Sequence, residues 1–398
     1  MVFTQIFEAI NTKVHGAQLN RSLKVLHISG SGDFLGGAEL CLYELIKEEC
    51  ASDYRCALIV PYDGEFAKAV VELDVPVKVI KFKPWSKSTS DGILKLLIKL
   101  LIKLFINVAA EIRLFLFLLT VKPCAIHINT SAVGTGCFAS KILNIPLIWH
   151  IRELLNWESG RTLYFPKVQR SLISTANSVI AVSKSAADTL HSCKRIINPI
   201  IVYDSIPVPD YRDRNIFRKG IPNIALIGSI FPAKGQYDAV RAISIVHARG
   251  YELTLLIAGD IKDSGYFDQL LSFIKENNIS NYVKFLGQVD EPYAVLEDSD
   301  ICLNCSMSES FGRVTVEGLL SGSLVVGRNT SGTAELLNNG NGLLFNTVDE
   351  LASLLIGSIN DFEKSRKIAK AGQEFAWDRF SDSSLSCNKI MEVFDNAK

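Results

Sequence analysis

The chain has 398 residues, more than one ordinary hydrophobic core organises, so the length predicts two domains. Hydrophobic residues make up 48% of the chain and charged residues 21%, which excludes a disordered protein. The 42 basic and 42 acidic residues cancel, so no overall field would attract nucleic acid, and no nucleic-acid partner is expected.

The N-terminal stretch 1–20 lacks the basic start and apolar centre of a secretory signal, which predicts a cytoplasmic protein. The nine cysteines are odd in number and lie mostly in apolar runs, as expected for buried thiols in a reducing compartment. Cys302 and Cys305 have the spacing of a redox or metal pair. No second pair of this kind follows, so we expect neither chemistry there.

Short apolar runs alternate with helical stretches along the whole chain. In the first half the runs are 23–29, 56–60, 77–80, 125–128, 146–150 and 178–183, and in the second half they are 224–229, 253–259, 283–287, 301–304 and 324–327. Continuous apolar strands between helices indicate parallel sheets covered on both faces. We therefore predict an α/β fold of two doubly wound, Rossmann-like domains that face each other across a cleft. Ligands of such sheets bind beyond the carboxyl ends of the strands.

The segment 207–222 is rich in proline and charge and has no apolar period, so it is predicted to be a linker. An N-terminal domain is therefore expected at 1–206 and a C-terminal domain at 223–380. A ligand is expected between the two domains.

Residues 93–120 have the hydropathy of a membrane span, but three lysines interrupt them. Lys95, Lys99 and Lys103 would each cost about 2.5–3.5 kcal/mol near the centre of a bilayer, so no crossing is expected. The lysines recur every four residues and occupy a narrow stripe of a helix. Two alternatives remain: a nearly buried helix whose lysine stripe faces water, or a basic amphipathic helix that lies on an anionic membrane.

The first strand leads into a glycine loop that includes Gly36 and Gly37. These glycines would let the backbone approach a ligand closely, and N–H groups at a helix start favour phosphate or sugar oxygens. The loop lacks the dinucleotide fingerprint, which argues against a nicotinamide dehydrogenase. His150 ends the strand at 146–150, and it is either a site residue or a satisfied structural histidine.

In the second half, Gly228 and Ser229 end a strand, and Lys234 follows in the turn before a helix. A lysine in this place can neutralise a diphosphate as a point charge. The alternative is a solvated loop lysine.

Residues 301–322 predict a strand, a polar loop with Glu309, a turn at Gly312 and a helix with Glu317 about one turn from its start. The first N–H groups of this helix can hold a phosphate, and they belong to Arg313, Val314 and Thr315. One ligand with hydroxyls on both sides of a diphosphate would therefore meet a carboxylate at each end. Asp298 and Asp300 imitate a metal-binding pair but precede the strand, so we expect no metal there.

Several of these motifs occur in the order seen in family 4 glycosyltransferases, and the chain resembles that family from about 23 to 380. The motifs are GGAE (36–39), WHIRE (149–153), GSIFPAKGQYDAV (228–240), ESFGRVTVEGLLSG (309–322) and SGTAELL (331–337). WHIRE is similar to members that build bacterial polysaccharides. The resemblance implies the GT-B fold, with the donor held mainly by the second domain and the acceptor by the first. It also implies a final helix, within 381–398, that crosses back to the first domain.

The resemblance assigns roles to individual residues. Glu309 would contact the donor sugar and Glu317 the ribose, while Lys234 would stabilise the departing diphosphate and His150 would lie beside the sugar. The implied catalytic residues are thus Glu309, Lys234 and His150, and the implied donor-binding residues are Gly36, Gly37, Gly228, Ser229, Lys234, Glu309, Gly312, Arg313, Val314, Thr315 and Glu317. Ser229 departs from the family, which usually has an arginine there.

The predicted function is retaining, metal-independent transfer of a hexosyl group from a UDP- or GDP-sugar to a saccharide, without a cofactor. The acceptor is expected to be lipid-linked, in cell-surface polysaccharide synthesis, with the protein in the cytoplasm and peripheral on the inner face of the membrane. The residues 93–120 would make the contact with anionic lipid. The alternatives are a two-lobed sugar- or nucleotide-sugar-binding protein without chemistry and a sugar-nucleotide epimerase on the same fold.

Overall fold

The computed structural model describes residues 14–15, 23–34, 36–88, 92–154, 161–190, 198–207, 211, 213–218, 220–289 and 291–397. Parts of the predicted N-terminal domain and linker lie outside these ranges. The chain forms two compact units, one from Met1–Asp204 with Ser383–Lys398 and the other from Ser205–Asp382. We call them unit 1 and unit 2.

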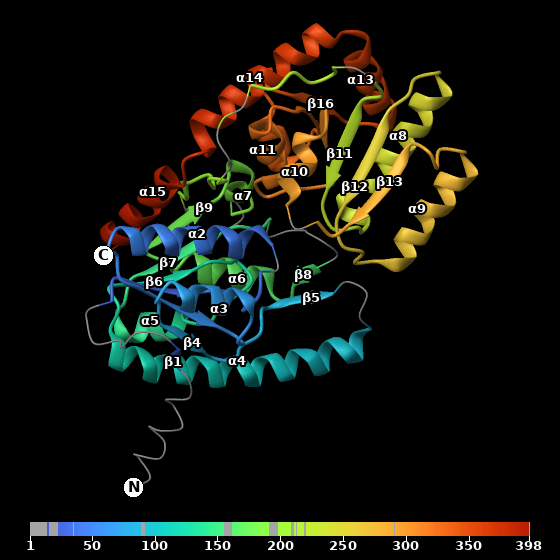
Figure 1. Ribbon diagram of the computed structural model, residues 1–398. Helices are drawn as coiled ribbons and strands as arrows, with labels where there is room; N and C mark the ends of the chain where they lie inside the picture. Colours follow the sequence, from blue (N-terminus) through green and yellow to red (C-terminus); the bar gives the residue numbers. More distant parts are fainter. Residues whose placement is uncertain are drawn as a thin grey trace. The chain divides into compact units, whose positions relative to one another are not determined.

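Unit 1 is built on an eight-stranded sheet in the order β1-β4-β3-β2-β6-β7-β9-β10 (Figure 1). Its strands are β1 (Val14–His15), β2 (Val25–Ile28), β3 (Cys56–Val60), β4 (Val77–Val79), β6 (Ala125–Ile128), β7 (Leu147–Ile151), β9 (Ser178–Ala181) and β10 (Ile200–Ile201). All neighbours pair in parallel except β1 with β4. A separate antiparallel pair joins β5 (Ser86–Ser88) to β8 (Arg161–Leu163).

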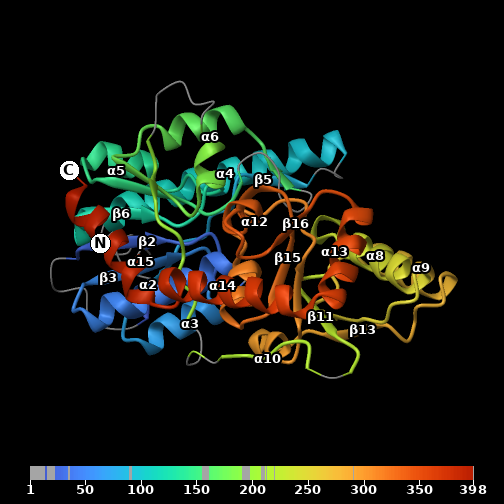
Figure 2. The same cartoon turned by 90° about the horizontal axis from the view of Figure 1, so that it is seen from above.

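Helices cover both faces of the unit 1 sheet (Figures 1 and 2). One face carries α2 (Gly37–Ala51), α3 (Glu65–Glu72) and α15 (Ser383–Asn396), and the other carries α4 (Ile93–Val121) and α5 (Cys137–Leu143). The unit also contains α6 (Pro166–Ile173) and α7 (Lys184–Asp188). The central strands β2, β3, β6 and β7 are buried throughout because both faces are covered, which is why they read as continuous apolar runs.

Unit 2 has a fully parallel six-stranded sheet in the order β13-β12-β11-β14-β15-β16. Its strands are β11 (Asn223–Ile227), β12 (Thr254–Ala258), β13 (Val283–Gly287), β14 (Ile301–Asn304), β15 (Leu324–Arg328) and β16 (Leu343–Phe345). Its helices are η1 (Pro232–Lys234), α8 (Gln236–Ala248), α9 (Ser264–Glu276), α10 (Pro292–Glu297), α11 (Arg313–Leu320), α12 (Ser331–Leu336), α13 (Val348–Asn360) and α14 (Phe362–Phe380). The predicted α/β fold of two parallel-sheet domains is confirmed.

Part of the segment predicted as a linker packs into unit 2. Ile216 and Phe217 are buried in its core, and the Phe217 N–H donates to the Asp300 carboxylate at 2.5 Å. The other Asp300 oxygen accepts from the Asn223 N–H at 3.0 Å. Asp300 therefore ties this segment to the start of β11. Positions 208–210, 212 and 219 of the predicted linker lie outside the described residues.

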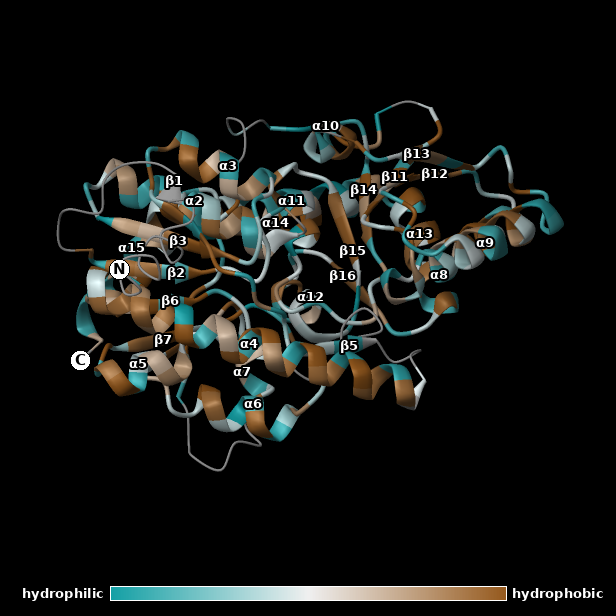
Figure 3. Cartoon of the chain, turned by 90° about the horizontal axis from the view of Figure 1, so that it is seen from below, coloured by the Kyte–Doolittle hydropathy of each residue, from teal (hydrophilic) through white to brown (hydrophobic). Residues whose placement is uncertain are grey.

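The long apolar helix α4 is not nearly buried, so the first of the two alternatives for 93–120 is wrong. Its apolar arc faces outward, with Phe105 78% and Leu94 74% exposed. Lys103, by contrast, turns toward the unit and donates to the carbonyl oxygens of Pro84 at 2.8 Å and Ser86 at 2.5 Å. Seen from below, hydrophobic residues run along most of the helix (Figure 3).

Helix α15 completes the core of unit 1 although it follows unit 2 in the sequence. Its residues Cys387, Ile390, Val393 and Phe394 belong to the same buried cluster as Leu42, Leu45 and Ile46 of α2. The Phe394 ring also contacts the rings of His27 and His127. The core of unit 1 is therefore closed by residues that follow unit 2 in the sequence.

We expect Phe394→Ala to lower the free energy of unfolding of unit 1 by about 3–5 kcal/mol, because it leaves a cavity against two histidine rings. Leu385→Ala is the matched control, since Leu385 lies on the same helix and is 49% exposed, and it should cost no more than about 0.5 kcal/mol. Denaturant unfolding of the full chain measures both. Equal effects would show that α15 does not close this core.

Candidate functional site

Two predicted site residues of unit 2 form an ion pair. Lys234, at the end of η1, points its Nζ at Oε1 of Glu309, 2.6 Å away. Both side chains are partly accessible, at 29% and 19% exposure. They follow β11 and β14, which are neighbours in the sheet, so both lie at the carboxyl edge where parallel sheets bind ligands. The structure thus brings together the cation and the carboxylate that the sequence placed 75 residues apart.

A close backbone contact positions this pair. Gly235 has a φ of +70°, and a Cβ there would lie 2.2 Å from the carbonyl oxygen of Cys305. The next turn is held as well, because the Met307 N–H donates to the carbonyl oxygen of Ala233 at 2.9 Å. The loop after β14 therefore lies directly against the loop after β11. Only glycine fits at position 235.

Helix α11 begins at Arg313, beside the same loop, and is preceded by Gly312, whose φ is +92°. The N-cap is a glycine and offers no side-chain cap to the first N–H groups, which belong to Arg313, Val314 and Thr315. These groups carry the positive end of the helix dipole and suit an anion. The Glu309 carbonyl oxygen meanwhile accepts from the Gly332 N–H at 2.9 Å, which fixes the loop to the start of α12.

Glu317 lies one turn into α11 and pairs with Arg313, whose Nε is 2.8 Å from its Oε1. Burial raises the pKa of Glu317, and the Arg313 guanidinium opposes that rise. Arg313 is therefore engaged with Glu317 in this structure.

Gly228 and Ser229 form the turn after β11, with Gly228 at a φ of +149°. A Cβ on the neighbouring Gly259 would lie 2.1 Å from the Gly228 carbonyl oxygen, so the turns after β11 and β12 pack without side chains between them. The Ser229 carbonyl oxygen accepts from Gln236 Nε2 at 2.9 Å. All the predicted unit 2 site residues thus lie in loops or helix starts at one edge of the sheet.

The sequence reasoning missed Asn304, the last residue of β14. Its buried amide nitrogen donates to the hydroxyls of Thr315 at 2.9 Å and Thr333 at 3.3 Å. The bonds connect the ends of β14, α11 and α12. A polar residue at the end of an otherwise apolar strand was the signal that could have found it.

In unit 1, His150 does not lie at an exposed strand tip as expected. It is inside β7 and fully buried. Its Nδ1 lies 3.4 Å from Nε2 of His127, whose Nδ1 is 2.9 Å from Nδ1 of His27, and His27 Nε2 reaches Glu49 at 2.9 Å. Burial holds the pKa of His150 and His127 well below the usual range, so both rings are neutral. His150 Nε2 is buried without a hydrogen-bond partner.

Arg152 and Glu153 follow β7 and are both engaged. Arg152 Nη1 lies 2.6 Å from the Asp204 carboxylate, and its Nε donates to Asn129 at 2.7 Å. Glu153 accepts from the Ser131 N–H and hydroxyl, each at 2.9 Å, and from the Thr130 hydroxyl. Arg152 is therefore committed to Asp204 rather than available as a cation for a diphosphate.

Gly36 and Gly37 lie at the start of α2, Gly36 as its N-cap with an extended backbone. Two residues on, Glu39 was not singled out by the sequence. Burial raises the pKa of Glu39 to about 7, with a further rise from the Glu153 carboxylate that Arg152 and backbone N–H groups oppose. A carboxyl that changes charge near neutral pH, beside a second carboxylate, is a candidate for binding a hydroxyl-rich ligand.

Within the described ranges, one group of side chains has metal-ligating atoms close together: His27, Glu49 and Cys56. All three are buried in unit 1. Cys302 and Cys305 are buried in unit 2, and burial raises the pKa of the Cys302 thiol to about 12, which removes its reactivity at neutral pH.

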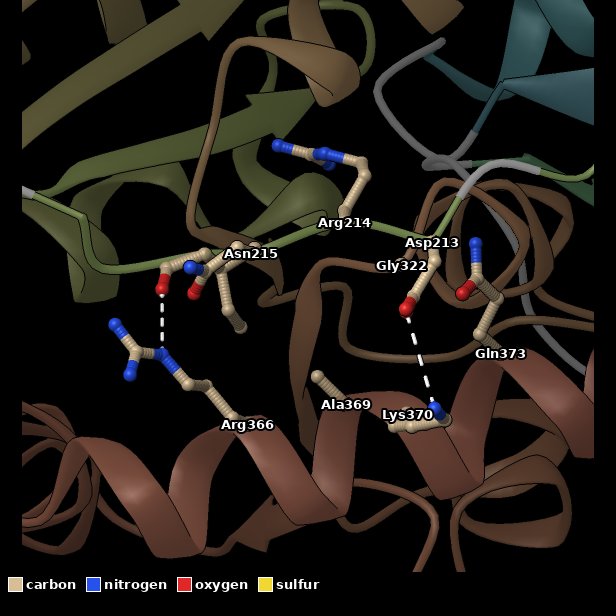
Figure 4. A pocket seen from close by; sticks show the side chains of 9 residues that line it. Asp213, Arg214, Asn215, Gly322, Arg366, Ala369, Lys370 and Gln373 are labelled. Carbon is tan, nitrogen blue, oxygen red and sulfur yellow. Dashed lines mark hydrogen bonds and ion pairs between the residues drawn. The ribbon is translucent and has the colours of Figure 1, made fainter.

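A hollow of about 320 Å³ opens on unit 2 between residues 213–216 and helix α14 (Figure 4). Its cations already have partners: Arg214 donates to the carbonyl oxygens of Leu296 and Ser299, and Lys370 lies 4.0 Å from Asp213. Gly322 in its wall precedes β15. The hollow therefore lies at the amino edge of the sheet, opposite Lys234 and Glu309.

The chain is similar to glycosyltransferases. Residues 208–375 match the family model "Glycosyl transferases group 1". An uncharacterized glycosyltransferase of Methanocaldococcus jannaschii is 26% identical over 62% of this chain and 68% of its own length. A phosphatidyl-myo-inositol mannosyltransferase of Propionibacterium freudenreichii is 30% identical over 56% of each chain. The solved structure of Anabaena HepE in complex with UDP has a TM-score of 0.73 and 25% identity, and covers 94% of this chain and 100% of that one.

We expect Gly235→Ala to lower the free energy of unfolding of unit 2 by more than Gly250→Ala. Both residues have positive φ, at +70° and +83°, so both substitutions carry the conformational cost of about 1 kcal/mol. A Cβ at 250 meets nothing within 4 Å, whereas a Cβ at 235 meets the Cys305 carbonyl oxygen. Denaturant unfolding of the two variants isolates the contact, and equal costs would contradict it.

We expect Glu39 to contribute stability to unit 1 at about pH 4.5 that is lost as the pH rises to about 7, and Glu39→Gln to remove this contribution. The folded form holds the Glu39 proton more tightly than the unfolded form, so folding is favoured at low pH. The difference between wild type and variant should reach at most about 3 kcal/mol. Denaturant unfolding across this range measures it, with Glu65→Gln, in the first turn of α3, as the control. Parallel curves for wild type and Glu39→Gln would refute the shift.

Proposed function

We propose a function for this chain from the premise that it carries a glycosyl transferases group 1 domain on the GT-B fold: it is a retaining glycosyltransferase that uses a nucleotide-diphosphate sugar. The observation that carries the proposal is the Lys234–Glu309 pair at the edge of the unit 2 sheet, next to the uncapped start of α11. A cation, a carboxylate and a row of N–H groups match a diphosphate that carries a sugar on one side and a ribose on the other.

The chemistry we propose is electrostatic. Breaking the bond between sugar and diphosphate creates positive charge on the sugar ring and additional negative charge on the leaving group. Lys234 and the first N–H groups of α11 would stabilise that negative charge, and such preorganised groups lower the barrier. This supplies the role that a metal ion has in other transferases, so we propose that no metal or cofactor is required.

Glu309 would have two successive partners in this proposal. It pairs with Lys234 in the structure. On donor binding the diphosphate would take over Lys234, which frees the Glu309 carboxylate to accept hydrogen bonds from sugar hydroxyls. Glu317, whose pKa burial raises, would accept from the ribose hydroxyls. Arg313, one turn earlier in α11, holds Glu317 in place.

The remaining site residues have supporting roles in the proposal. Gly228, Ser229 and Gly312 would let the donor approach the backbone. In unit 1, we propose that the backbone at Gly36 and Gly37, at the start of α2, also binds a ligand. Because His150 is fully buried, we assign it a positioning role behind Arg152 rather than contact with the sugar.

We further propose that the acceptor is a lipid-linked saccharide in cell-surface polysaccharide synthesis, and that the protein works in the cytoplasm at the inner face of the membrane. One relative is named for a phosphatidyl-myo-inositol substrate. The exposed apolar surface of α4 gives independent support, because a soluble chain rarely leaves so many large apolar side chains in water.

UDP should bind the wild-type protein in EDTA, and Lys234→Ala should weaken that binding at least about tenfold, because a hydrogen bond from a charged group is worth about 1.5–3 kcal/mol. Glu317→Ala should weaken it as well. Isothermal titration with UDP, GDP and NAD measures this. Lys262→Ala is the matched control, since Lys262 is an exposed lysine of the same unit that pairs with Asp260.

Either nucleoside diphosphate would support the proposal, and the one that binds names the base of the donor. No binding of UDP or GDP to the wild type would overturn it and favour a sugar-binding protein without chemistry. Binding that needs a divalent cation would contradict metal independence alone.

A further inference from the structure

Helix α4 presents a continuous apolar stripe to solvent. Leu94, Leu97, Leu101, Phe105, Val108 and Ile112 are each more than half exposed. They recur every three or four residues, which places them on one side of a helix over about 27 Å. We call this stripe the α4 face. Helix α5 packs against α4 (Figure 3). It carries two exposed apolar side chains of its own, Phe138 and Ile142, which are 60% and 69% exposed.

The other side of α4 is fastened to unit 1. Ala110, Leu114 and Leu118 are buried. The Asn107 amide bonds both to the N–H of Lys83, at 2.8 Å, and to its carbonyl oxygen, at 2.9 Å. The orientation of the helix is therefore set by specific contacts, and the α4 face is exposed as a consequence of them.

The charged residues of α4 indicate what kind of surface binds the α4 face. Residues 94–121 contain four cations, Lys95, Lys99, Lys103 and Arg113, and one acid, Glu111. Glu111 is occupied, since it accepts the N–H groups of Gly136, Phe138 and Ala139 at the start of α5, at 2.7–2.9 Å. Lys95 and Arg113 are exposed. An apolar stripe with cations alongside it and no available carboxylate in this helix complements a surface that is apolar within and anionic outside.

We infer that the α4 face docks on a bilayer containing anionic phospholipids, with α4 lying flat in the interface. The inference deepens the proposed function and rests on it for its purpose, which is to bring the enzyme to a membrane-bound acceptor. A second copy of the chain suits the face less well, because pairing two such helices would bring their cations together.

The helix is long and apolar enough to cross a membrane by length and composition alone. Crossing would require α4 to leave unit 1. It would break the bonds of Asn107 and Lys103 to residues 83–86 and remove Glu111 from α5. Those polar groups would then enter hydrocarbon without partners, which is costly. Lying flat keeps every one of these contacts and buries the α4 face.

The test is flotation of the full-length protein with vesicles of phosphatidylglycerol and, separately, of phosphatidylcholine. The variant Leu101→Ser/Phe105→Ser changes two side chains that are 67% and 78% exposed, so the fold should survive. We expect it to reduce partitioning into phosphatidylglycerol vesicles at least about tenfold. The control Leu271→Ser/Leu286→Ser changes two exposed leucines of unit 2 and should partition like the wild type.

Depth measurements separate lying flat from spanning. Tryptophan introduced at Leu94 or at Ile112 should be quenched equally by lipids brominated near the headgroup. Different depths for the two ends would overturn the flat orientation. No flotation of the wild type with phosphatidylglycerol, or equal flotation with both lipids, would overturn the docking.

Sedimentation in the absence of lipid tests whether the α4 face binds a second copy of the chain instead. A dimer that the Leu101→Ser/Phe105→Ser variant abolishes would assign the face to a second copy and overturn the membrane inference. UDP titration of the same proteins keeps the two proposals apart. If the wild type floats with vesicles but does not bind UDP, the proposed function is wrong and the membrane inference stands. If it binds UDP but does not float, the membrane inference is wrong and the proposed function stands.

Discussion

The arrangement of the candidate donor site depends on one steric constraint, the absence of a side chain at Gly235. Its α-carbon lies against the carbonyl of Cys305, and this brings the loop after β11 into contact with the loop after β14. Lys234 lies in the first of these loops and Glu309 in the second. Their ion pair is therefore a consequence of backbone packing. The Asn304 amide bonds to Thr315 of α11, and the Gly332 N–H of α12 bonds to the Glu309 carbonyl oxygen. Both helices are thereby fixed to these loops.

Much of this edge was predictable because parallel sheets impose strong rules on sequence. Strands covered on both faces must be apolar throughout, so β14 could be recognised and the polar residues after it stood out. Neighbouring strands deliver those residues to the same edge. The pairing of Lys234 with Glu309 itself was not predictable, since local pattern carries no information on contacts between residues 75 positions apart.

Unit 1 shows more clearly where local pattern stops being informative. His150 looked like a residue at a strand tip, but its neighbours on β6 and β2 are also histidines, and together they form a buried polar row that ends at Glu49. The sequence also does not show which side of α4 faces solvent. Both sides of that helix are apolar, so its orientation depends on Asn107 and Glu111 and their bonds to distant backbone groups.

The position of α15 has a consequence for synthesis of the chain on the ribosome. Most of unit 1 is made before unit 2, yet residues made after unit 2 complete its core. Translation proceeds at about 5–20 residues per second, so the surface that awaits Phe394 and its neighbours stays uncovered for on the order of ten seconds or more while unit 2 is made. During that interval the nascent chain is a natural client for a chaperone that binds exposed apolar surface, and the core of unit 1 can close only after α15 has left the ribosome.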